Sequence, residues 1–297
     1  MMEIIKSNVK IDFLSKAKIF FMISAILCAA SILMIMTKGF NYGIDFAGGT
    51  IIQAKFEKAP DLNTIRKTLT KMELGDVVIQ NFGDEKEVLI RVEQGDKNLQ
   101  AVSKQIKDSI FKAYPENKII IERVEQVGPK VGSELKSKAL MAILYAIIGI
   151  LIYVSVRFEF IYSLGAVLAL FHDVLITMGI FSLVGREINL PIIAAALTIV
   201  GYSLNDTIVV FDRIRENLKK GVDKSQLKEV MNKSLNETLS RTILTSLTTL
   251  LAVVSLYLFG GEVINGFAFA LLLGIIVGTY SSIGIASALV YTIKKRK

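Results

Sequence analysis

The sequence predicts a membrane protein, an all-α bundle of six transmembrane helices with one α+β domain inserted into it. Three observations predict this fold class. Of the 297 residues, 52% are hydrophobic, above the roughly 45–50% that is usual for soluble domains. The charged residues are concentrated in one insert and in a few loops, and the rest of the chain is nearly free of charge. Six apolar runs are about long enough to cross a ~30 Å hydrocarbon core at ~1.5 Å per residue.

The six apolar runs are continuous, which favours helices over the alternating pattern of a β-barrel. In chain order they cover residues 19–36, 139–156, 161–184, 190–211, 243–259 and 267–293. The first run follows a basic start, as a signal peptide would. At 18 residues it is long for that role, and its small residues Ala29, Ala30 and Ser31 lie inside the run. We therefore expect an uncleaved anchor.

Lys and Arg are distributed unevenly between the two sides of the predicted bundle. One side of the bundle holds seventeen: four in the N-terminal segment that includes Lys6, one at Arg157, eight in 212–241 and four in the tail. The short loops on the other side hold only Arg186. The positive-inside rule then places both termini in the cytoplasm. The net charge of +8 is an orientation signal on this interpretation, and no nucleic-acid partner is expected.

The predicted organisation follows from the apolar runs and the charges. It consists of a cytoplasmic N-terminus (1–18), a first transmembrane helix (19–37), an extracytoplasmic α+β domain (38–137), transmembrane helices two to six (138–293) with a cytoplasmic loop (212–241), and a cytoplasmic basic tail (294–297).

The insert is predicted to be ferredoxin-like, with the order βαββαβ. Strands are expected at 49–56, 77–82, 88–92 and 119–127, from their short apolar and β-branched runs. One helix begins after an N-cap at Asp61 and another after Asn98. The insert contains no His or Cys, which excludes a thiolate or imidazole metal site there. We expect a binding or lever domain.

Common catalytic and nucleotide-binding motifs are missing from the sequence. It contains no G-x-x-x-x-G-K-[ST], no H-E-x-x-H and no G-x-S-x-G. We therefore predict that the protein is not an enzyme and holds no cofactor. Any work that it performs would draw on an ion gradient or on a partner.

Two charged residues at membrane depth are the main candidates for function. Charged groups there cost about 2.5–3.5 kcal/mol on insertion scales and are functional candidates by default. Asp206 in the fourth run and Arg241 at the start of the fifth are predicted to form a proton relay, as a pair that opens and closes. The residues expected to pack around them are Gly201, Tyr202, Asn205 and Thr245. In the alternatives, Asp206 is a static hydrogen-bonding group and Arg241 only extends to the headgroups.

Two further polar residues lie near the middle of the third run. His172 and Asp173 are a possible secondary relay, and a packing role is the alternative. In the last run, small residues recur every four positions at Gly274, Gly278, Ser282 and Ala286. This row permits close helix packing, within the chain or between subunits.

Five motifs, in order and with their spacing, resemble the SecD/SecF family of export membrane proteins. They are G-I-D-F-A-G-G-T (43–50), V-G-P-K-V-G (127–132), G-Y-S-L-N-D-T-I-V-V-F-D-R-I-R-E-N (201–217), L-S-R-T (239–242) and L-F-G-G (258–261). The resemblance covers nearly the whole chain and is closest to the SecF side of the family. One departure is Phe211, where a small residue is common in the family.

The resemblance implies a fold and a function. The six helices would be half of a twelve-helix bundle related to the RND exporters, with SecD as the other half. The pair would promote preprotein export through SecYEG, driven by the proton motive force, in the cytoplasmic (inner) membrane of a bacterium or archaeon. The family's proton-conducting aspartate and arginine fall on Asp206 and Arg241, and its less understood H-D pair falls on His172 and Asp173.

We therefore expect an ion-driven accessory subunit of protein export, embedded in the lipid bilayer. The coupling ion is the proton, with sodium as the alternative. Two rival functions remain: an RND-like exporter of small or lipid substrates, and a structural scaffold of the translocon without ion flow.

Overall fold

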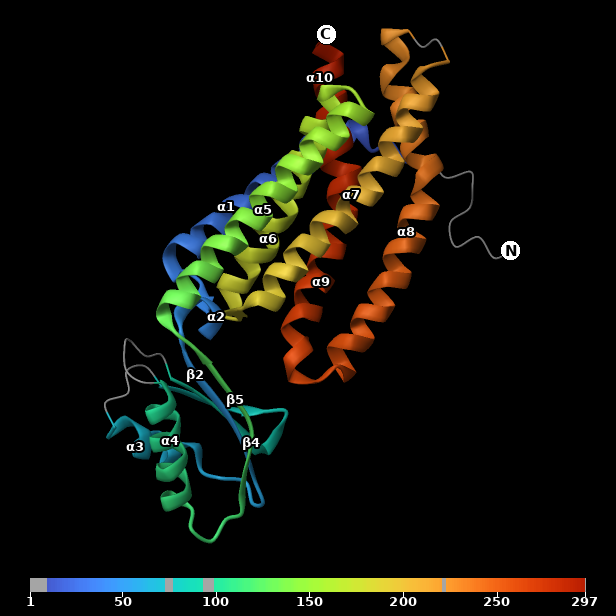
Figure 1. Cartoon of the computed structure of the whole chain (residues 1–297). Coiled ribbons are helices and arrows are strands. Elements are labelled where there is room, and N and C mark those ends of the chain that lie inside the picture. Colours follow the sequence, from blue (N-terminus) through green and yellow to red (C-terminus); the bar gives the residue numbers. More distant parts are fainter. Residues whose placement is uncertain (1–9, 73–76, 93–98, 221–222, 297) are drawn as a thin grey trace. The chain divides into compact units, whose positions relative to one another are not determined.

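The computed structural model describes residues 10–72, 77–92, 99–220 and 223–296 (Figure 1). Lys6 and the predicted N-cap residue Asn98 lie outside the described residues. The chain divides into two compact units. The helical unit comprises the chain up to Asn41, Ala142–Arg186 and Pro191–Lys297. The α+β unit comprises Tyr42–Met141 and Glu187–Leu190.

Six helices are long and apolar enough to cross a membrane within the described part of the chain, as the sequence predicts. Five are α1 (Ala17–Lys38), which follows the short η1 (Leu14–Lys16), α5 (Pro129–Arg157), α6 (Phe160–Val184), α7 (Leu190–Leu218) and α8 (Leu227–Phe259). The sixth is continuous through α9 (Gly261–Ser281), the π-helical segment η3 (Ser282–Ala286) and α10 (Ser287–Arg296). The turn η2 (Lys224–Gln226) precedes α8.

Several helices extend beyond the apolar runs that predict them. Helix α5 begins at Pro129, inside the insert predicted at 38–137, and Pro suits the first turn of a helix. Helix α7 continues to Leu218 and α8 begins at Leu227, so most of the predicted loop at 212–241 is helical. Hydropathy marks only the part of a helix that lies in hydrocarbon, whereas Glu, Lys and Arg continue a helix readily in water.

The connection between α6 and α7 is short and sharply turned. Helix α6 ends at Gly185, which has φ +67°, and its N–H donates to Phe181 O and Ser182 O. Glycine adopts this left-handed conformation without the steric cost of a Cβ, which is why it so often ends helices. Strand β6 (Glu187–Ile188) follows and pairs with β1 (Asn41–Tyr42).

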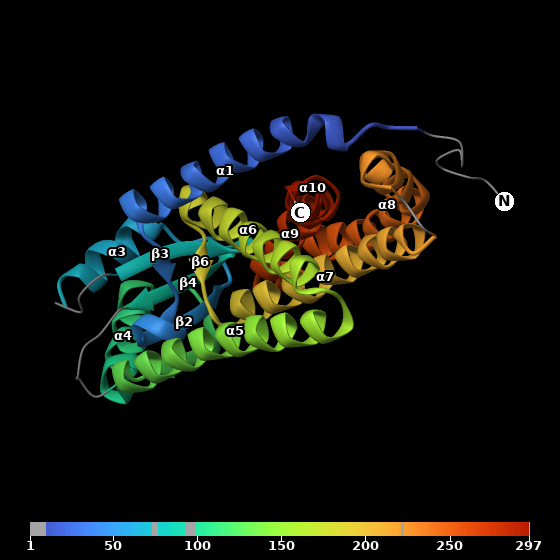
Figure 2. The ribbon, with the colours of Figure 1, turned by 90° about the horizontal axis from the view of Figure 1, so that it is seen from above.

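The last helix packs against α1, α6 and α8, and its glycines also contact α7 (Figure 2). Its small residues are internal contacts. A Cβ on Gly274 would overlap the side chain of Ile199 on α7, and one on Gly278 would lie 3.0 Å from Ser203 Cβ. The structure thus assigns these two glycines of the small-residue row to packing within the chain.

The α+β unit has the predicted ferredoxin-like order. Its elements are β2 (Gly49–Phe56), α3 (Leu62–Thr70), β3 (Val77–Phe82), β4 (Asp84–Val92), α4 (Leu99–Ala113) and β5 (Ile119–Val127), and a short helix α2 (Ile44–Ala47) precedes them. The sheet order is β3-β4-β2-β5 and all three pairings are antiparallel. The predicted strand at 88–92 starts four residues earlier, because its turn is tighter than expected.

Alternation along the strands builds the core of the α+β unit. Ile52, Ala54 and Phe56 of β2 are at most 1% exposed and pack with Ile65 of α3 and Ile106 of α4. The predicted N-cap is confirmed, because Asp61 Oδ1 accepts from Asn63 N over 3.0 Å and Oδ2 accepts from Thr64 Oγ1 over 2.7 Å.

Candidate functional site in the membrane helices

His172 and Asp173 lie side by side on α6 and are 6% and 1% exposed. His172 Nδ1 is 2.9 Å from Asp173 Oδ1, and its Nε2 is 3.0 Å from Ser24 Oγ on α1. Tyr280 of the last helix stacks on the imidazole with ring centroids 6.2 Å apart, and its hydroxyl is 3.1 Å from Ser24 Oγ. Both ring nitrogens of the histidine therefore have partners.

Asp173 accepts hydrogen bonds from two further helices. Ser203 Oγ on α7 donates to Asp173 Oδ2 over 2.6 Å, and Ser281 Oγ on the last helix donates to the same atom over 2.7 Å. Ser281 immediately precedes the π-helical segment η3, and such segments are frequent at functional sites. This buried network joins α1, α6, α7 and the last helix through one carboxyl group.

Asp206 lies three residues after Ser203, on the same side of α7, and is 4% exposed. Ser246 Oγ on α8 lies 3.5 Å from Asp206 Oδ2, a long hydrogen bond, and the hydroxyl of Thr245 on the same helix also faces the carboxyl. Ser246 Oγ is also 2.7 Å from Thr279 Oγ1 of the last helix. Asp206 is thus a buried carboxyl with sparse polar contacts, whereas Asp173 is surrounded by hydrogen-bonding partners.

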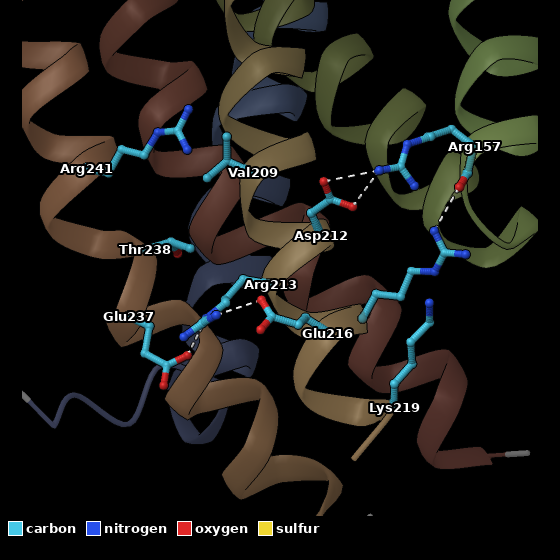
Figure 3. Close-up of a pocket in the computed structure, with 10 residues that line it drawn as sticks. Arg157, Val209, Asp212, Arg213, Glu216, Lys219, Glu237, Thr238 and Arg241 are labelled. Atoms are coloured by element: carbon cyan, nitrogen blue, oxygen red, sulfur yellow. Dashed lines mark hydrogen bonds and ion pairs between the residues drawn. The ribbon is translucent and has the colours of Figure 1, made fainter. Parts of the chain in front are cut away.

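Arg241 lies at the exposed surface of α8, and no ion pair within 4.0 Å joins it to Asp206 or to any other described acidic residue. The predicted pair between Asp206 and Arg241 is therefore not formed in this structure. Figure 3 shows Arg241 extending from α8 toward Val209, the α7 residue three positions beyond Asp206.

A cavity of about 520 Å³ lies where α7, α8 and the α5–α6 turn meet (Figure 3). It is lined by Arg157, Val209, Asp212, Arg213, Arg215, Glu216, Lys219, Glu237, Thr238 and Arg241.

Most of the charges in this cavity are paired. Arg213 lies between Glu237 and Glu216, at 2.6 Å from each, and Arg157 lies 3.2 Å from Asp212. The sequence does not predict this cavity, because it forms where charged helix ends from separate parts of the chain meet.

The four residues expected around the relay divide into two groups. Gly201 and Asn205 lie on the exposed side of α7, and a Cβ on Gly201 would meet no described atom within 4 Å. Tyr202 and Thr245 are half-buried, and Thr245 Oγ1 donates to Arg241 O over 3.0 Å.

Within the described part of the chain, Tyr202 Oη and Thr242 Oγ1 are buried hydroxyls without a hydrogen-bond partner. Orphaned groups of this kind are uncommon and call for an explanation.

Sequence reasoning missed the roles of Ser24, Tyr280 and Ser281. A signal was present for the first of these, because Ser24 and Ser31 are seven residues apart on an otherwise apolar helix and both are 6% exposed. Seven residues are about two turns, so both hydroxyls lie on one side of α1.

Family models and individual relatives both relate this chain to one group of proteins. Residues 105–296 match the family described as protein export membrane protein SecD/SecF, C-terminal, and residues 34–60 match the SecD/SecF GG motif. The chain is similar to protein translocase subunit SecF of Calditerrivibrio nitroreducens (60% identity, covering 99% of this chain and 97% of the relative). It is also similar to protein translocase subunit SecF of Vibrio alginolyticus (47%, covering 97% and 91%).

A solved structure extends the comparison to the fold. SecDF of Thermus thermophilus, described as a translocon-associated membrane protein, is 39% identical with a TM-score of 0.86. The match covers 99% of this chain, which spans 40% of the length of that SecDF chain. The family match, the relatives and the fold agree, and the chain belongs to the SecD/SecF family of protein export membrane proteins, on its SecF side.

Proposed function

We propose that this chain, together with a SecD partner, uses the proton motive force to promote preprotein export through SecYEG. The names of the relatives support an accessory role in the Sec pathway. The SecD partner is supported by the solved SecDF, in which a sequence like this one makes up 40% of a longer chain.

The proposed setting is the cytoplasmic membrane of a bacterium, with both termini in the cytoplasm and the α+β unit outside. The distribution of Lys and Arg supports this orientation. The cavity at the α7 and α8 ends then opens to the cytoplasm and gives protons or sodium ions a route between water and the region of Asp206.

The observation that carries the proposal is that Arg241 is near enough for its charge to act on Asp206 but forms no ion pair with it within 4.0 Å. Burying an ionised carboxylate without a cation beside it is costly. We therefore assign this conformation to the protonated state of Asp206. Loss of the proton creates a charge that draws Arg241 toward α7.

The movement of Arg241 gives the orphaned hydroxyls a role. Tyr202 lies one turn before Asp206 and Thr242 follows Arg241, so a shift of α8 against α7 changes the surroundings of both. A buried hydroxyl without a partner costs about 1–3 kcal/mol. The unpaired hydroxyls of Tyr202 and Thr242 therefore favour a second arrangement of α7 and α8 in which both form hydrogen bonds. A two-state relay requires such a second arrangement.

The test is export kinetics in cells in which Asp206→Asn replaces the wild-type protein at a normal level. Maturation of a secreted precursor is followed by pulse-chase, and co-purification checks assembly with the partner. Asp223→Asn is the matched control, because it neutralises an exposed carboxyl in the connection between α7 and α8. We expect Asp206→Asn to slow export strongly in an intact complex and the control to leave it unchanged.

The same experiment separates the rival functions. Normal export with Asp206→Asn would remove the relay role and favour a scaffold. Normal protein export together with a lost small-molecule efflux phenotype would favour an exporter. Measuring export at fixed proton gradient with and without sodium distinguishes the two coupling ions.

A further inference from the structure

Two sequence motifs that the relay does not use meet at the short helix α2. The motif at 43–50 contains α2, and the motif at 127–132 contains the start of α5. A Cβ on Gly132 would lie 3.0 Å from Phe46 O, and one on Gly48 would lie 3.0 Å from Pro129 Cα. Glycine at these two positions allows α2 to lie directly against the first turn of α5.

Helix α2 also bonds to the beginning of α7. Asp45 Oδ2 accepts a hydrogen bond from Leu190 N, the first residue of α7, over 2.9 Å. The first N–H groups of a helix have no partner inside it, and a carboxylate there also interacts favourably with the helix dipole. The first turn of α7 has no acidic residue of its own. Asp45 supplies this charge from a site 145 residues earlier in the chain.

Two more contacts hold the same connection. Gly43 N donates to Ile188 O over 2.8 Å. Glu187 forms an ion pair of 3.2 Å with Arg91 of β4, whose side chain is 7% exposed. A Cβ on Gly43 would overlap the Glu187 carboxylate. Glu187 and Ile188, which precede α7, are therefore bonded to the sheet and to the residue before α2 respectively.

We propose that Asp45 is a positioning residue that couples the α+β unit directly to α7, the helix that carries Asp206. The chain passes through the α+β unit a second time at Glu187–Leu190, and the Asp45 bond lies inside this unit and holds the first residue of α7. Asp206 is sixteen residues beyond Leu190, about 24 Å along a continuous helix at ~1.5 Å per residue. If α7 is displaced at Asp206, Leu190 at the start of the same helix is displaced with it, and Asp45 is bonded to Leu190 N.

The first measurement is amide hydrogen exchange in the complex purified with its SecD partner. In Asp45→Ala we expect exchange at Leu190 N to be about five- to tenfold faster, the range usual for loss of an N-cap. Asp45→Asn keeps an accepting oxygen but loses the charge, so it should retain most of the wild-type protection. Asp108→Ala removes an exposed carboxyl of α4 in the same unit and serves as the matched control.

The second measurement tests the coupling. We expect Asp206→Asn to change exchange at Gly43 N clearly less in Asp45→Ala than when Asp45 is present, because the Gly43 and Glu187 contacts remain in that variant. Export should be slowed at least severalfold by Asp45→Ala and much less by Asp45→Asn. Leu190→Pro removes the donor and leaves Asp45 in place, and proline is tolerated at a first helical position. It should slow export similarly, which guards against misfolding of Asp45→Ala.

The proposal rests on the proposed function only for its export readout. Unchanged exchange at Leu190 in Asp45→Ala would overturn it, and so would equal damage from Asp45→Asn and Asp45→Ala. Normal export with Asp206→Asn would overturn the proposed function instead, while the exchange at Leu190 would still decide the role of Asp45.

Discussion

Ser203 and Asp173 join α7 to α6 through a hydrogen bond of 2.6 Å, and Asp206 lies three residues beyond Ser203 on α7. The two buried carboxyl groups are therefore connected through less than one turn of a single helix. Asp173 receives bonds from several helices and Asp206 receives one long bond. We infer that Asp173 holds the helices in register and that Asp206 is the group free to change state.

Replacement of Asp173 should therefore affect stability. Asp173→Ala leaves Ser203, Ser281 and His172 without their shared acceptor, and we expect a loss of about 3 kcal/mol. Thermal unfolding of the purified protein in detergent measures this loss. Ser255→Ala is the control, since it removes an exposed hydroxyl that bonds only to Leu251 O of its own helix. Equal melting temperatures for the two variants would contradict the structural role of Asp173.

Packing of α1 against α6 depends on the absence of a side chain at Gly179. A Cβ there would lie 2.6 Å from Ser31 Cα, a backbone atom that moves only if the helices separate. Gly179→Ala should destabilise the protein by about 1–3 kcal/mol, the usual cost of overpacking. Gly149→Ala on α5 meets nothing within 4 Å and should be neutral or slightly stabilising. The contact is disproved if both variants unfold at the same temperature.

The N-cap of α3 makes stability depend on pH. Hydrogen bonds from the Thr64 hydroxyl and from Asn63 N hold the pKa of Asp61 below its ordinary value of 3.8. A carboxyl with a lowered folded pKa stabilises the protein above its unfolded pKa, and the contribution is lost as the pH falls through the folded value. Asp61→Ala should therefore be less stable than wild type at neutral pH.

The difference should close in acid, below a pH of about 3.8. Thermal unfolding of both proteins at several pH values measures it, and Asp108→Ala provides the comparison for an exposed carboxyl on the other helix of the unit. A difference that stays constant from neutral pH to pH 3 would show that Asp61 does not cap the helix as a carboxylate.

Much of the fold follows from local patterns in the sequence. The six apolar runs and the bounds of β2, β3 and β5 agree with the structure, because hydropathy and strand alternation depend on neighbouring residues. The ends of the membrane helices do not follow from hydropathy, as the extension of α7 to Leu218 shows. Those ends lie in water, where propensity rather than transfer energy decides whether a helix continues.

The candidate site was predictable only in part. Asp206 and Asp173 stand out because a charge in an apolar run is expensive. Their partners do not stand out, because a serine costs little in a membrane helix and Ser24 and Ser281 lie far from Asp173 in sequence. The distance between Asp206 and Arg241 depends on how α7 and α8 are placed, and this placement is a property of the packed bundle.

The contribution of Glu187–Leu190 to the α+β unit limits how the protein can be recombined. A chimera that exchanged only residues 42–141 with a relative would separate Arg91 from Glu187, with which it forms an ion pair. An exchange that keeps this ion pair must therefore include both segments of the unit. The unit includes four residues, 187–190, that a cut at the two ends of the insert would leave behind.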